Sequence, residues 1–375
     1  MACDVAVVGL GAMGSAALYH LALAGKRAIG LERAAPGHLG GSSHGESRII
    51  RLAYFEHPSY VPLVRAAYDQ WRALEAGSGQ ALLTVTGILE AGFPGSQIVS
   101  GSLASSLEHG IPHERLTGTQ INARFPAFDL PPGWDGVFQP DAGLLRPELA
   151  IATELAAAAS LGAEVRTGVT VTAIEPAGAG VRITLQDATV IEAGAAIVAA
   201  GAWIGELAPV LAPHLTLTRQ VMAWFDPARP ADVTPGRFPV FLLETPGDAV
   251  YGFPDFAGTG VKAASHIEGR VLPKASAARQ DADPSDARQV LDVLEPYIPA
   301  AAGPVRAMQT CIYTRTPDQD FVIDTVPGHP QIVLASPCSG HGFKFSILIG
   351  QILADLATKG ATSHDISRFS LARLS

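Results

Sequence analysis

A glycine-rich turn near the N-terminus is the chemical feature that the sequence shows most clearly. Gly9, Gly11 and Gly14 form a Gly-x-Gly-x-x-Gly pattern, and Glu32 follows Gly9 by 23 residues. In such a pattern the glycines permit a tight turn, close approach of a pyrophosphate and close helix packing, while the acidic residue accepts hydrogen bonds from ribose hydroxyls. The helix N-terminus that follows attracts the anion. We therefore predict a dinucleotide site, which could hold NAD or FAD; the alternative is a glycine turn that only packs an ordinary βα unit.

The elements that must position this turn follow from its flanks. Residues 4–8 are a short β-branched run, residues 12–24 have helical spacing before Gly25, and residues 28–31 have the composition of a second strand. Strand, helix and strand within about 30 residues form a βαβ unit, which implies a parallel sheet with a right-handed crossover.

Later segments predict a second kind of architecture. We expect helices over 57–76, 147–161 and 343–358, a hairpin formed by 165–174 and 181–185, and buried strands over 195–199 and 331–335. Residues 216–260 are rich in aromatic and β-branched residues separated by proline and glycine, which indicates antiparallel sheet. The predicted fold is α/β (α+β, two-lobed). A Rossmann-type nucleotide-binding domain is assembled from residues 1–80, 145–215 and 320–375, and a β-rich antiparallel substrate domain from 81–144 and 216–319.

Composition excludes several classes of function. The chain is 48% hydrophobic and 16% charged, with a net charge of -9 and no basic stripe, so disorder and nucleic-acid binding are not expected. Its three cysteines, Cys3, Cys311 and Cys338, are too widely spaced for a disulfide framework or a zinc site, which fits a reducing cytoplasm and no bound metal. We expect neither a signal peptide nor a membrane span, because Glu154 and Glu206 interrupt the alanine-rich stretches.

Three further segments carry a resemblance. Residues 41–51 (GSSHGESRIIR), 307–314 (AMQTCIYT) and 339–346 (SGHGFKFS) are similar, in order and spacing, to segments of the monomeric sarcosine oxidase and N-methyltryptophan oxidase family. Together with 251–254 (YGFP) and the segment around Lys262, the likeness covers essentially the whole chain. It implies FAD, a covalent flavin linkage and amine oxidation.

The resemblance also assigns the flavin contacts. Cys311 corresponds to the cysteine whose sulfur bonds the 8α-methyl of the flavin ring, a bond that requires thiolate character; the alternative is a buried free cysteine. The other expected FAD-binding residues are Gly9, Gly11, Gly14, Glu32, Arg33, Ser42, Ser43, Arg48, Ile49, Val171, Ala200, Gly201, Trp203, Gly342, Phe343 and Lys344.

Charged residues within these segments acquire catalytic roles through the same resemblance. Lys262, one of only five lysines, corresponds to the lysine that activates oxygen near flavin N5, where a fixed cation stabilises developing negative charge. Arg51 and Lys344 are expected to hold a substrate carboxylate between two cations. Arg48, three residues before Arg51 and adjacent to it if the segment is helical, is expected to face the flavin. The alternatives are a solvated Lys262 and structural ion pairs.

Histidines and aromatic residues complete the expected site. His44 and His266 are expected among the catalytic residues, and His341 against the substrate, although lone histidines are often structural. Tyr251, Phe253 and Tyr313 would wall an apolar slot, and Leu242 or Val250 would modify its size. Aromatic residues at period two are more commonly core residues.

The predicted activity is oxidation of a small secondary amino acid, sarcosine or another N-methyl or cyclic amino acid, to an imine, with O2 reduced to H2O2 by a monomer. Three alternatives remain open at this point: a flavin amine dehydrogenase that passes electrons to a carrier, an NAD-dependent dehydrogenase, and a non-catalytic flavoprotein.

Overall fold

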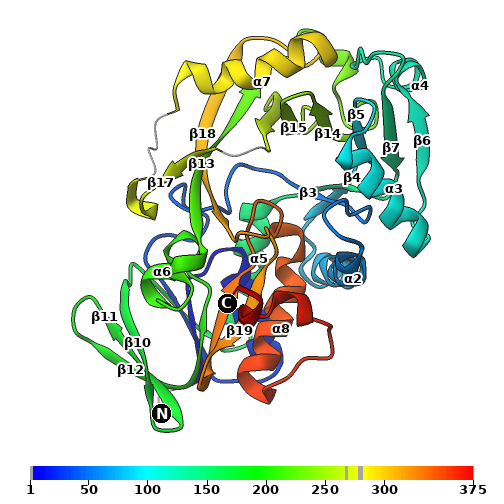
Figure 1. Cartoon of the computed structure of the whole chain (residues 1–375). Helices are drawn as coiled ribbons and strands as arrows, with labels where there is room; N and C mark the ends of the chain where they lie inside the picture. Colours follow the sequence, from blue (N-terminus) through cyan, green and yellow to red (C-terminus); the bar gives the residue numbers. More distant parts are fainter. Residues whose placement is uncertain (1–2, 267–268, 278–281, 375) are drawn as a thin grey trace.

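The computed structural model describes residues 3–266, 269–277 and 282–374. It has two lobes stacked one above the other, with the N-terminus and helix α8 in the lower lobe and helix α7 along the top of the upper lobe (Figure 1). The helices are α1 (Ala12–Leu23), α2 (Val61–Ser78), α3 (Gln97–His109), α4 (Gly118–Arg124), α5 (Pro147–Ser160), α6 (Ile204–Leu207), α7 (Pro284–Tyr297) and α8 (Ser346–Lys359). Short 3-10 turns include η1 (Pro58–Tyr60), η2 (Gly201–Trp203), η3 (Ala212–His214), η4 (Pro230–Asp232), η5 (Ala275–Ala277), η6 (Phe343–Phe345), η7 (Ser367–Phe369) and η8 (Leu371–Leu374).

The lower lobe is built on a largely parallel sheet. Its strands are β1 (Cys3–Val8), β2 (Ala28–Glu32), β9 (Glu164–Thr167), β10 (Val171–Ala177), β11 (Gly180–Leu185), β12 (Val190–Val198), β19 (Val322–Val326) and β20 (His329–Ser336). Strands β9, β2, β1, β12 and β20 lie side by side in parallel, and β10 with β11 forms an antiparallel hairpin. These strands come from residues 3–32, 164–198 and 322–336, segments far apart in the sequence.

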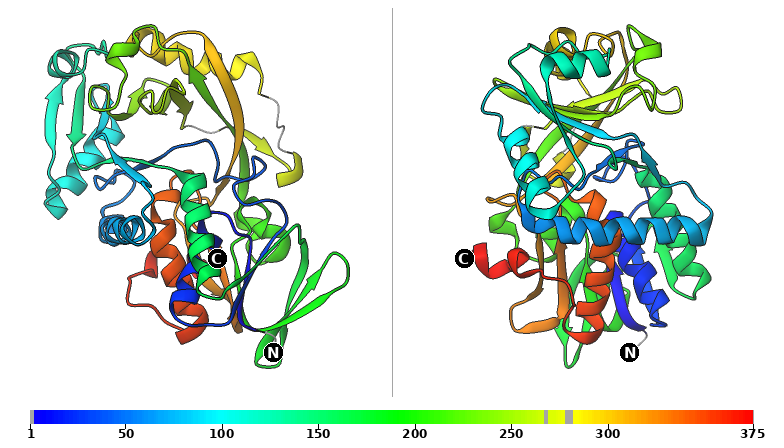
Figure 2. Two further views of the ribbon diagram at one scale, coloured as in Figure 1. Left: turned by 180° about the vertical axis from the view of Figure 1, so that it is seen from behind. Right: turned by 90° about the vertical axis from the view of Figure 1, so that its right-hand side faces the viewer.

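Both faces of this sheet are buried, which explains why its strands are continuously apolar. Val5 and Val7 point to the face covered by α1, α2, α5 and α8, whereas Ala6 and Val8 point to the face covered by the β10–β11 hairpin and α6. Helix α2 also packs against α8 and lies across the lower lobe, facing the upper one (Figure 2).

The upper lobe is a second, mostly antiparallel sheet. Its strands are β5 (Ile88–Gly92), β6 (Glu114–Thr117), β7 (Asp135–Gln139), β13 (Thr216–Phe225), β14 (Val240–Thr245), β15 (Asp248–Gly252), β16 (Val261–Ser265), β17 (Arg270–Leu272) and β18 (Val305–Arg315). Strands β13 and β18 are paired over most of their length and run from the lower lobe into the upper one (Figure 1). A small three-stranded sheet of β3 (Arg48–Ile50), β8 (Gly143–Leu145) and β4 (Leu83–Val85) connects the segments of both lobes.

Three local expectations need correction. The predicted strand 165–174 is two strands, because the chain turns at Gly168 with a positive φ of 72° and only β10 enters the hairpin. Arg48 lies on strand β3, so Arg48 and Arg51 are not on one helical face. The upper sheet also contains one parallel pair, β14 with β5, within a region predicted to be antiparallel. The boundaries of the two domains remain a prediction.

Candidate functional site

Two adjoining cavities lie at the junction of the lobes. The first, of about 130 Å³, is bounded by residues of both lobes, and the second, of about 190 Å³, surrounds the glycine-rich turn. They share the walls Ala12, Met13, Ser42, Ser43, Pro337 and Cys338. The two cavities therefore form one elongated trough, with a nucleotide end at the turn and a substrate end near β14 and β15.

The glycine turn leaves room for a ligand where the motif requires it. Gly9 has a φ of +89°, and a Cβ there would lie 2.6 Å from the Ala199 carbonyl oxygen. A Cβ on Gly14 would lie 1.7 Å from the Gly9 oxygen, so Gly14 serves packing within the turn. Gly11 has only Ser43 Oγ nearby, at 3.6 Å, and it lines the cavity. A pyrophosphate can thus approach Gly11, where the backbone is open.

Glu32 ends β2 beside this turn. Its carboxylate accepts hydrogen bonds from the backbone N–H groups of Leu10 (2.8 Å) and Ala34 (3.0 Å), and the side chain is almost fully buried. These bonds fix the carboxylate in the cavity wall, where its remaining lone pairs can accept hydrogen bonds from ribose hydroxyls.

The remaining predicted nucleotide contacts also meet at this end. Arg33 lies 4.0 Å above the Trp203 ring, a cation–π contact that closes the side of the cavity. The lining includes Gly9, Gly11, Glu32, Arg33, Ser42, Ser43, Val171, Ala200, Gly201 and Trp203.

Arg51 dominates the substrate end. It lines the first cavity, yet its guanidinium already has partners: Nη2 donates to both Glu56 oxygens (2.7 and 2.8 Å), Nη1 donates to the Ala53 carbonyl (2.6 Å), and Nε lies 3.3 Å from Glu90 Oε1. Burial opposes the charge, but the two carboxylates keep the pKa of Arg51 above its usual value. Arg51, which was predicted to bind the carboxylate of the substrate, is therefore a cation within a buried cluster of charges.

Lys344 faces the same cavity from η6. Its Nζ donates to the His341 carbonyl oxygen (2.7 Å) and lies 5.2 Å from the centre of the Tyr54 ring. Burial, and then the nearby Arg51, lower the pKa of Lys344 to about 7. Two of the expected substrate ligands thus meet, and one of them titrates near neutrality.

Cys311 lies on β18 and borders the first cavity. The side chain is buried, with Sγ 3.9 Å from the carbonyl oxygen of Ser42. Burial raises the pKa of the Cys311 thiol, while Arg48 and Lys262 act in the opposite direction. The residue most able to favour the thiolate is Arg48, which lines the cavity beside it and donates to the Ser42 and Ser47 carbonyls.

Lys262 is not one of the described residues that line the two cavities. Its Nζ donates to the carbonyl oxygens of Gly45 (2.6 Å) and Ser47 (2.7 Å) and lies 4.7 Å from the Phe253 ring centre. Burial, then Arg48, lower its pKa well below the usual range. Lys262 thus binds the backbone of residues 45–47 and lies next to Phe253, which lines the first cavity.

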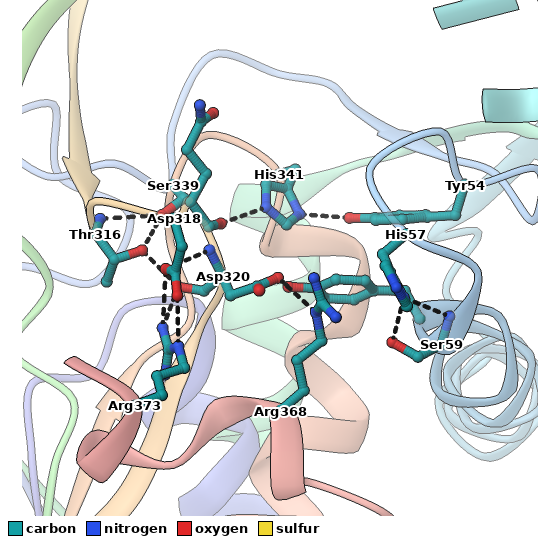
Figure 3. Close-up of polar contacts among 12 residues, drawn as sticks. Tyr54, His57, Ser59, Thr316, Asp318, Asp320, Ser339, His341, Arg368 and Arg373 are labelled. Carbon is teal, nitrogen blue, oxygen red and sulfur yellow. Dashed lines mark hydrogen bonds and ion pairs between the residues drawn. The ribbon is translucent and has the colours of Figure 1, made fainter. Parts of the chain in front are cut away.

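The three predicted histidines have different surroundings. His266 lines the cavity between Tyr251 and Tyr313, and burial lowers its pKa to about 4. His341 also lines it, but both ring nitrogens are engaged, Nδ1 with the Tyr54 hydroxyl and Nε2 with the Gln319 carbonyl (Figure 3). His44 lies outside the cavity walls, with Nδ1 3.3 Å from Gln309 Oε1. His266 is consequently the histidine best placed to meet a substrate.

The other predicted residues lie where the sheet of the upper lobe faces the trough. Tyr251 and Phe253 alternate on one face of β15 and the segment after it, and Tyr313 approaches from β18. The first cavity is also lined by Ile49, Leu242, Gly342 and Phe343. Val250, the alternative modifier of the slot, is buried in the core on the other side of the sheet.

Several residues around the substrate end were not anticipated. Glu56 and Phe55 line the cavity, and Glu90 lies behind Arg51. Gln139 fixes the turn after Arg51 by accepting from the backbone N–H groups of Leu52 and Ala53, both at 2.9 Å. The only available signal was Glu90, a charged residue inside the apolar run of residues 88–91.

The described part of the chain contains neither a metal-binding cluster nor a membrane-spanning helix. Within residues 3–266, 269–277 and 282–374, no cluster of three or more His, Cys, Asp or Glu side chains is arranged to hold a metal ion. Over the same ranges, no helix has the length and apolar character needed to cross a membrane.

Comparison with known proteins gives a consistent result. Residues 4–356 match the family described as FAD dependent oxidoreductase (DAO). The chain is 39% identical to monomeric sarcosine oxidase of Streptomyces avermitilis, over 99% of this chain and 97% of that protein. It is 36% identical to N-methyl-L-tryptophan oxidase of Yersinia pestis, over 99% of each.

Solved structures share the fold. NikD, titled an unusual amino acid oxidase, superimposes with a TM-score of 0.86 at 28% identity, covering 98% of this chain and 97% of that one. L-proline dehydrogenase from P. horikoshii has a TM-score of 0.84 at 18% identity, covering 99% and 97%, a likeness of fold alone. The open backbone at Gly11, the buried Glu32 and the continuous trough fit an extended dinucleotide such as FAD. Motif, trough and relatives agree, and the chain belongs to the DAO family of FAD-dependent oxidoreductases.

Proposed function

We propose that this enzyme oxidises a small secondary amino acid, sarcosine or another N-methyl or cyclic amino acid, to an imine while O2 is reduced to H2O2. The observation that carries the proposal is the meeting of Arg51 and Lys344 at an aromatic-walled cavity that also contains Cys311. Two cations on one wall suit a carboxylate, and the names of the relatives, sarcosine oxidase and N-methyl-L-tryptophan oxidase, support an N-methyl amino acid.

The nucleotide end would hold the ADP portion of FAD through Gly9, Gly11, Glu32 and Arg33, and the substrate end would hold the flavin ring near Arg48 and Cys311. FAD, when bound, supplies a two-electron acceptor for the C–H bond next to the substrate nitrogen. Membership of an FAD-dependent family argues against the nicotinamide alternative.

Substrate orientation would come from the charged wall. For Arg51 to receive a carboxylate, its Nη2 must share or exchange the Glu56 carboxylate that it now contacts. Tyr251, Tyr313 and Phe253 would confine the apolar part of the substrate. His266, kept neutral by burial, would add no positive charge beside the amine of the substrate.

A panel of amines with the purified holoenzyme tests this proposal. We expect sarcosine, other N-methyl amino acids or cyclic imino acids to bleach the flavin absorbance and to release peroxide on aeration. The corresponding amines without a carboxylate should react poorly. Failure of every amino acid to bleach the flavin would overturn the proposal and favour a binding protein that keeps the fold.

The choice between oxidase and dehydrogenase depends on Lys262. We propose that Lys262, in its protonated form, stabilises negative charge during oxygen reduction, acting from just behind the cavity wall beside Phe253. Lys262→Met should then slow reoxidation by O2 about 10²- to 10³-fold while reduction by the amine is retained. Unchanged reoxidation, measured by stopped-flow, would instead favour a dehydrogenase that uses a carrier.

A thioether between Cys311 and the flavin is a separate proposal, supported by the position of Sγ at the cavity and by Arg48 nearby. Acid precipitation should leave the yellow colour in the pellet of the wild type, whereas Cys311→Ala should release it to the supernatant. Release from the wild type would contradict the tether without affecting the oxidase proposal.

We further propose that the protein is a monomer, in line with the name of the Streptomyces relative. Light scattering measures the molar mass in solution and tests this directly.

A further inference from the structure

Glu90 is a buried carboxylate whose position calls for a functional explanation. It interrupts the apolar strand β5, between Leu89 and Ala91, and none of its surface is exposed. Among the described residues neither of its oxygens accepts a well-formed hydrogen bond, although Arg51 Nε forms an ion pair with Oε1 at 3.3 Å and the Ser102 hydroxyl lies close by. Burying an ionised carboxylate without hydrogen bonds is costly, so a residue of this kind is retained only where the charge cluster around it compensates.

The position of Glu90 places it directly behind the substrate end. Its cross-strand neighbour is Leu242 on β14, whose neighbour on β15 is Tyr251, and both of these line the first cavity. Neighbours across a ladder project from the same face of a sheet, so Glu90 projects from the face that carries Leu242 and Tyr251. Arg51 Nε lies 3.3 Å from Glu90 Oε1 and separates the carboxylate from the cavity.

Few charged groups of the described residues face Glu90. They are Arg51 and Glu56 from the segment after β3 and Lys344 from η6, while α3 contributes the Ser102 hydroxyl and β7 contributes Val137 as the other ladder neighbour. With every group ionised, this cluster has two positive and two negative charges. An incoming substrate carboxylate would add a third negative charge to a buried site, an unfavourable excess.

Glu90 is the carboxylate best suited to remove that excess. Glu56 receives two hydrogen bonds from Arg51, which lowers its pKa to about 2 despite its burial, so it stays ionised. Glu90 has no such pair of bonds from Arg51, and burial raises its pKa to about 7, with Arg51 and the Ser102 hydroxyl opposing. A further negative charge nearby raises the affinity of a carboxylate for its proton.

We propose that Glu90 is a positioning residue that holds Arg51 through Nε and takes up one proton from solvent when the carboxylate of the substrate binds. This rests on the proposed carboxylate site at Arg51 and Lys344. Protonation keeps the buried cluster at two positive and two negative charges when the substrate carboxylate is present.

Proton uptake on binding of propanoate, a carboxylate without an amine to oxidise, tests this in the holoenzyme. Calorimetric titration at pH 8 in two buffers of different ionisation enthalpy gives the number of protons taken up per ligand bound. We expect Glu90→Gln, which keeps the shape but cannot ionise, to take up about one proton fewer than the wild type. Above pH 7, the Kd of the wild type for propanoate should rise with pH more steeply than the Kd of Glu90→Gln. The difference should be up to about tenfold per pH unit.

Lys344 is the competing source of proton uptake, because its pKa is also about 7 and a bound carboxylate favours its charged form. Lys344→Arg keeps the positive charge at all these pH values, so the uptake that remains in it belongs to Glu90. The pKa values of His266 and His341 are lowered to about 4 by burial, so both start neutral at pH 8. Glu154→Gln is a matched control, since Glu154 is an equally buried glutamate on α5 that pairs with Ser15, outside both cavities.

The outcomes separate the two proposals. Uptake that falls in Glu90→Gln, persists in Lys344→Arg and is unchanged in Glu154→Gln supports the role of Glu90. Equal uptake in Glu90→Gln and wild type, or none in Lys344→Arg, overturns it. If Glu90→Gln does not fold, the Lys344→Arg measurement still decides. Absence of any propanoate binding to the wild type, or binding unchanged in Arg51→Met, would instead refute the carboxylate site itself and remove the basis for this inference.

Discussion

The two ends of the trough are built in opposite ways. The nucleotide end depends on backbone geometry, with Gly9, Gly11 and Gly14 within six residues and one carboxylate, Glu32, bonded to backbone N–H groups. The substrate end depends on side-chain charges, with Arg51 and Glu56 from the segment after β3, Glu90 from β5 and Lys344 from η6 brought together.

This difference has consequences for substitution. At Gly9 and Gly14 of the nucleotide end, an added atom meets backbone atoms that cannot move without distorting the turn. At the substrate end, each charge is balanced by the others, so a substitution changes the electrostatics and pH dependence of several groups at once. We expect steric changes to be decisive at the first end and charge changes at the second.

The largest effect is expected from Gly14→Ala. The new Cβ would lie 1.7 Å from the Gly9 oxygen, which belongs to backbone, so the turn must distort at a cost of about 3 kcal/mol or more. Gly11→Ala is the matched control, since its Cβ meets only Ser43 Oγ at 3.6 Å. Gly14→Ala should purify without flavin and with a lowered Tm, whereas Gly11→Ala should keep its Tm and bind FAD more weakly. Equal losses of Tm in both variants would contradict a packing role special to Gly14.

A smaller but more selective effect is expected from Arg51→Met. Removing one partner of a buried charge pair typically costs about 2–5 kcal/mol, so KM for an amino acid substrate should rise by roughly 30-fold or more. The matched amine without a carboxylate should show little change, because it never used the guanidinium. Arg51→Lys, which keeps the charge but loses the fork geometry, should lie between the two. An equal loss for both substrates would indicate that Arg51 only supports the fold.

The smallest effect, taken per pH unit, concerns Glu154, a buried carboxyl on helix α5. Burial raises its pKa to about 8 from a usual value of 4.5, although Ser15 donates to it. The folded protein therefore keeps a proton that the unfolded chain loses, and this contribution to stability is lost as pH rises from about 4.5 to 8. In Glu154→Gln, urea unfolding should give a decline in stability shallower by up to about 1.4 kcal/mol per pH unit. Parallel plots of unfolding free energy against pH for wild type and Glu154→Gln would contradict this. They would show that Glu154 ionises in the folded protein as readily as in the unfolded chain.

Local patterns predicted the nucleotide end because its parts are close in the sequence. The strand over 4–8, the helix from residue 12 and the strand over 28–31 correspond to β1, α1 and β2, with ends that differ by one residue. The predicted fold class was confirmed, and the mixed sheets match the DAO fold. The break at Gly168 was missed because apolar alternation continues through it, although a single glycine ends the strand.

The substrate end was predictable only where a resemblance supplied residue roles. Arg51, Lys344, Tyr251 and Cys311 were anticipated in this way and meet at one cavity, while Lys262 lies a layer behind it. Their catalytic and binding roles remain predictions. The partners of Arg51 were not foreseeable, because nothing in the spacing of residues 51, 56 and 90 indicates that their charges meet.

The sequence by itself determined the elements whose signals are local: the βαβ unit, the glycine turn, the apolar strands of a buried sheet and the stop of α8 at Gly360. Short-range sterics and hydrophobic periodicity act within about 30 residues, so such features can be predicted without tertiary contacts. Only the tertiary structure decided which charges share the buried space behind the cavity. Burial and Coulomb interactions act through space, and the pKa values of Glu90 and Lys344 therefore depend on strands and turns more than 200 residues apart in the chain.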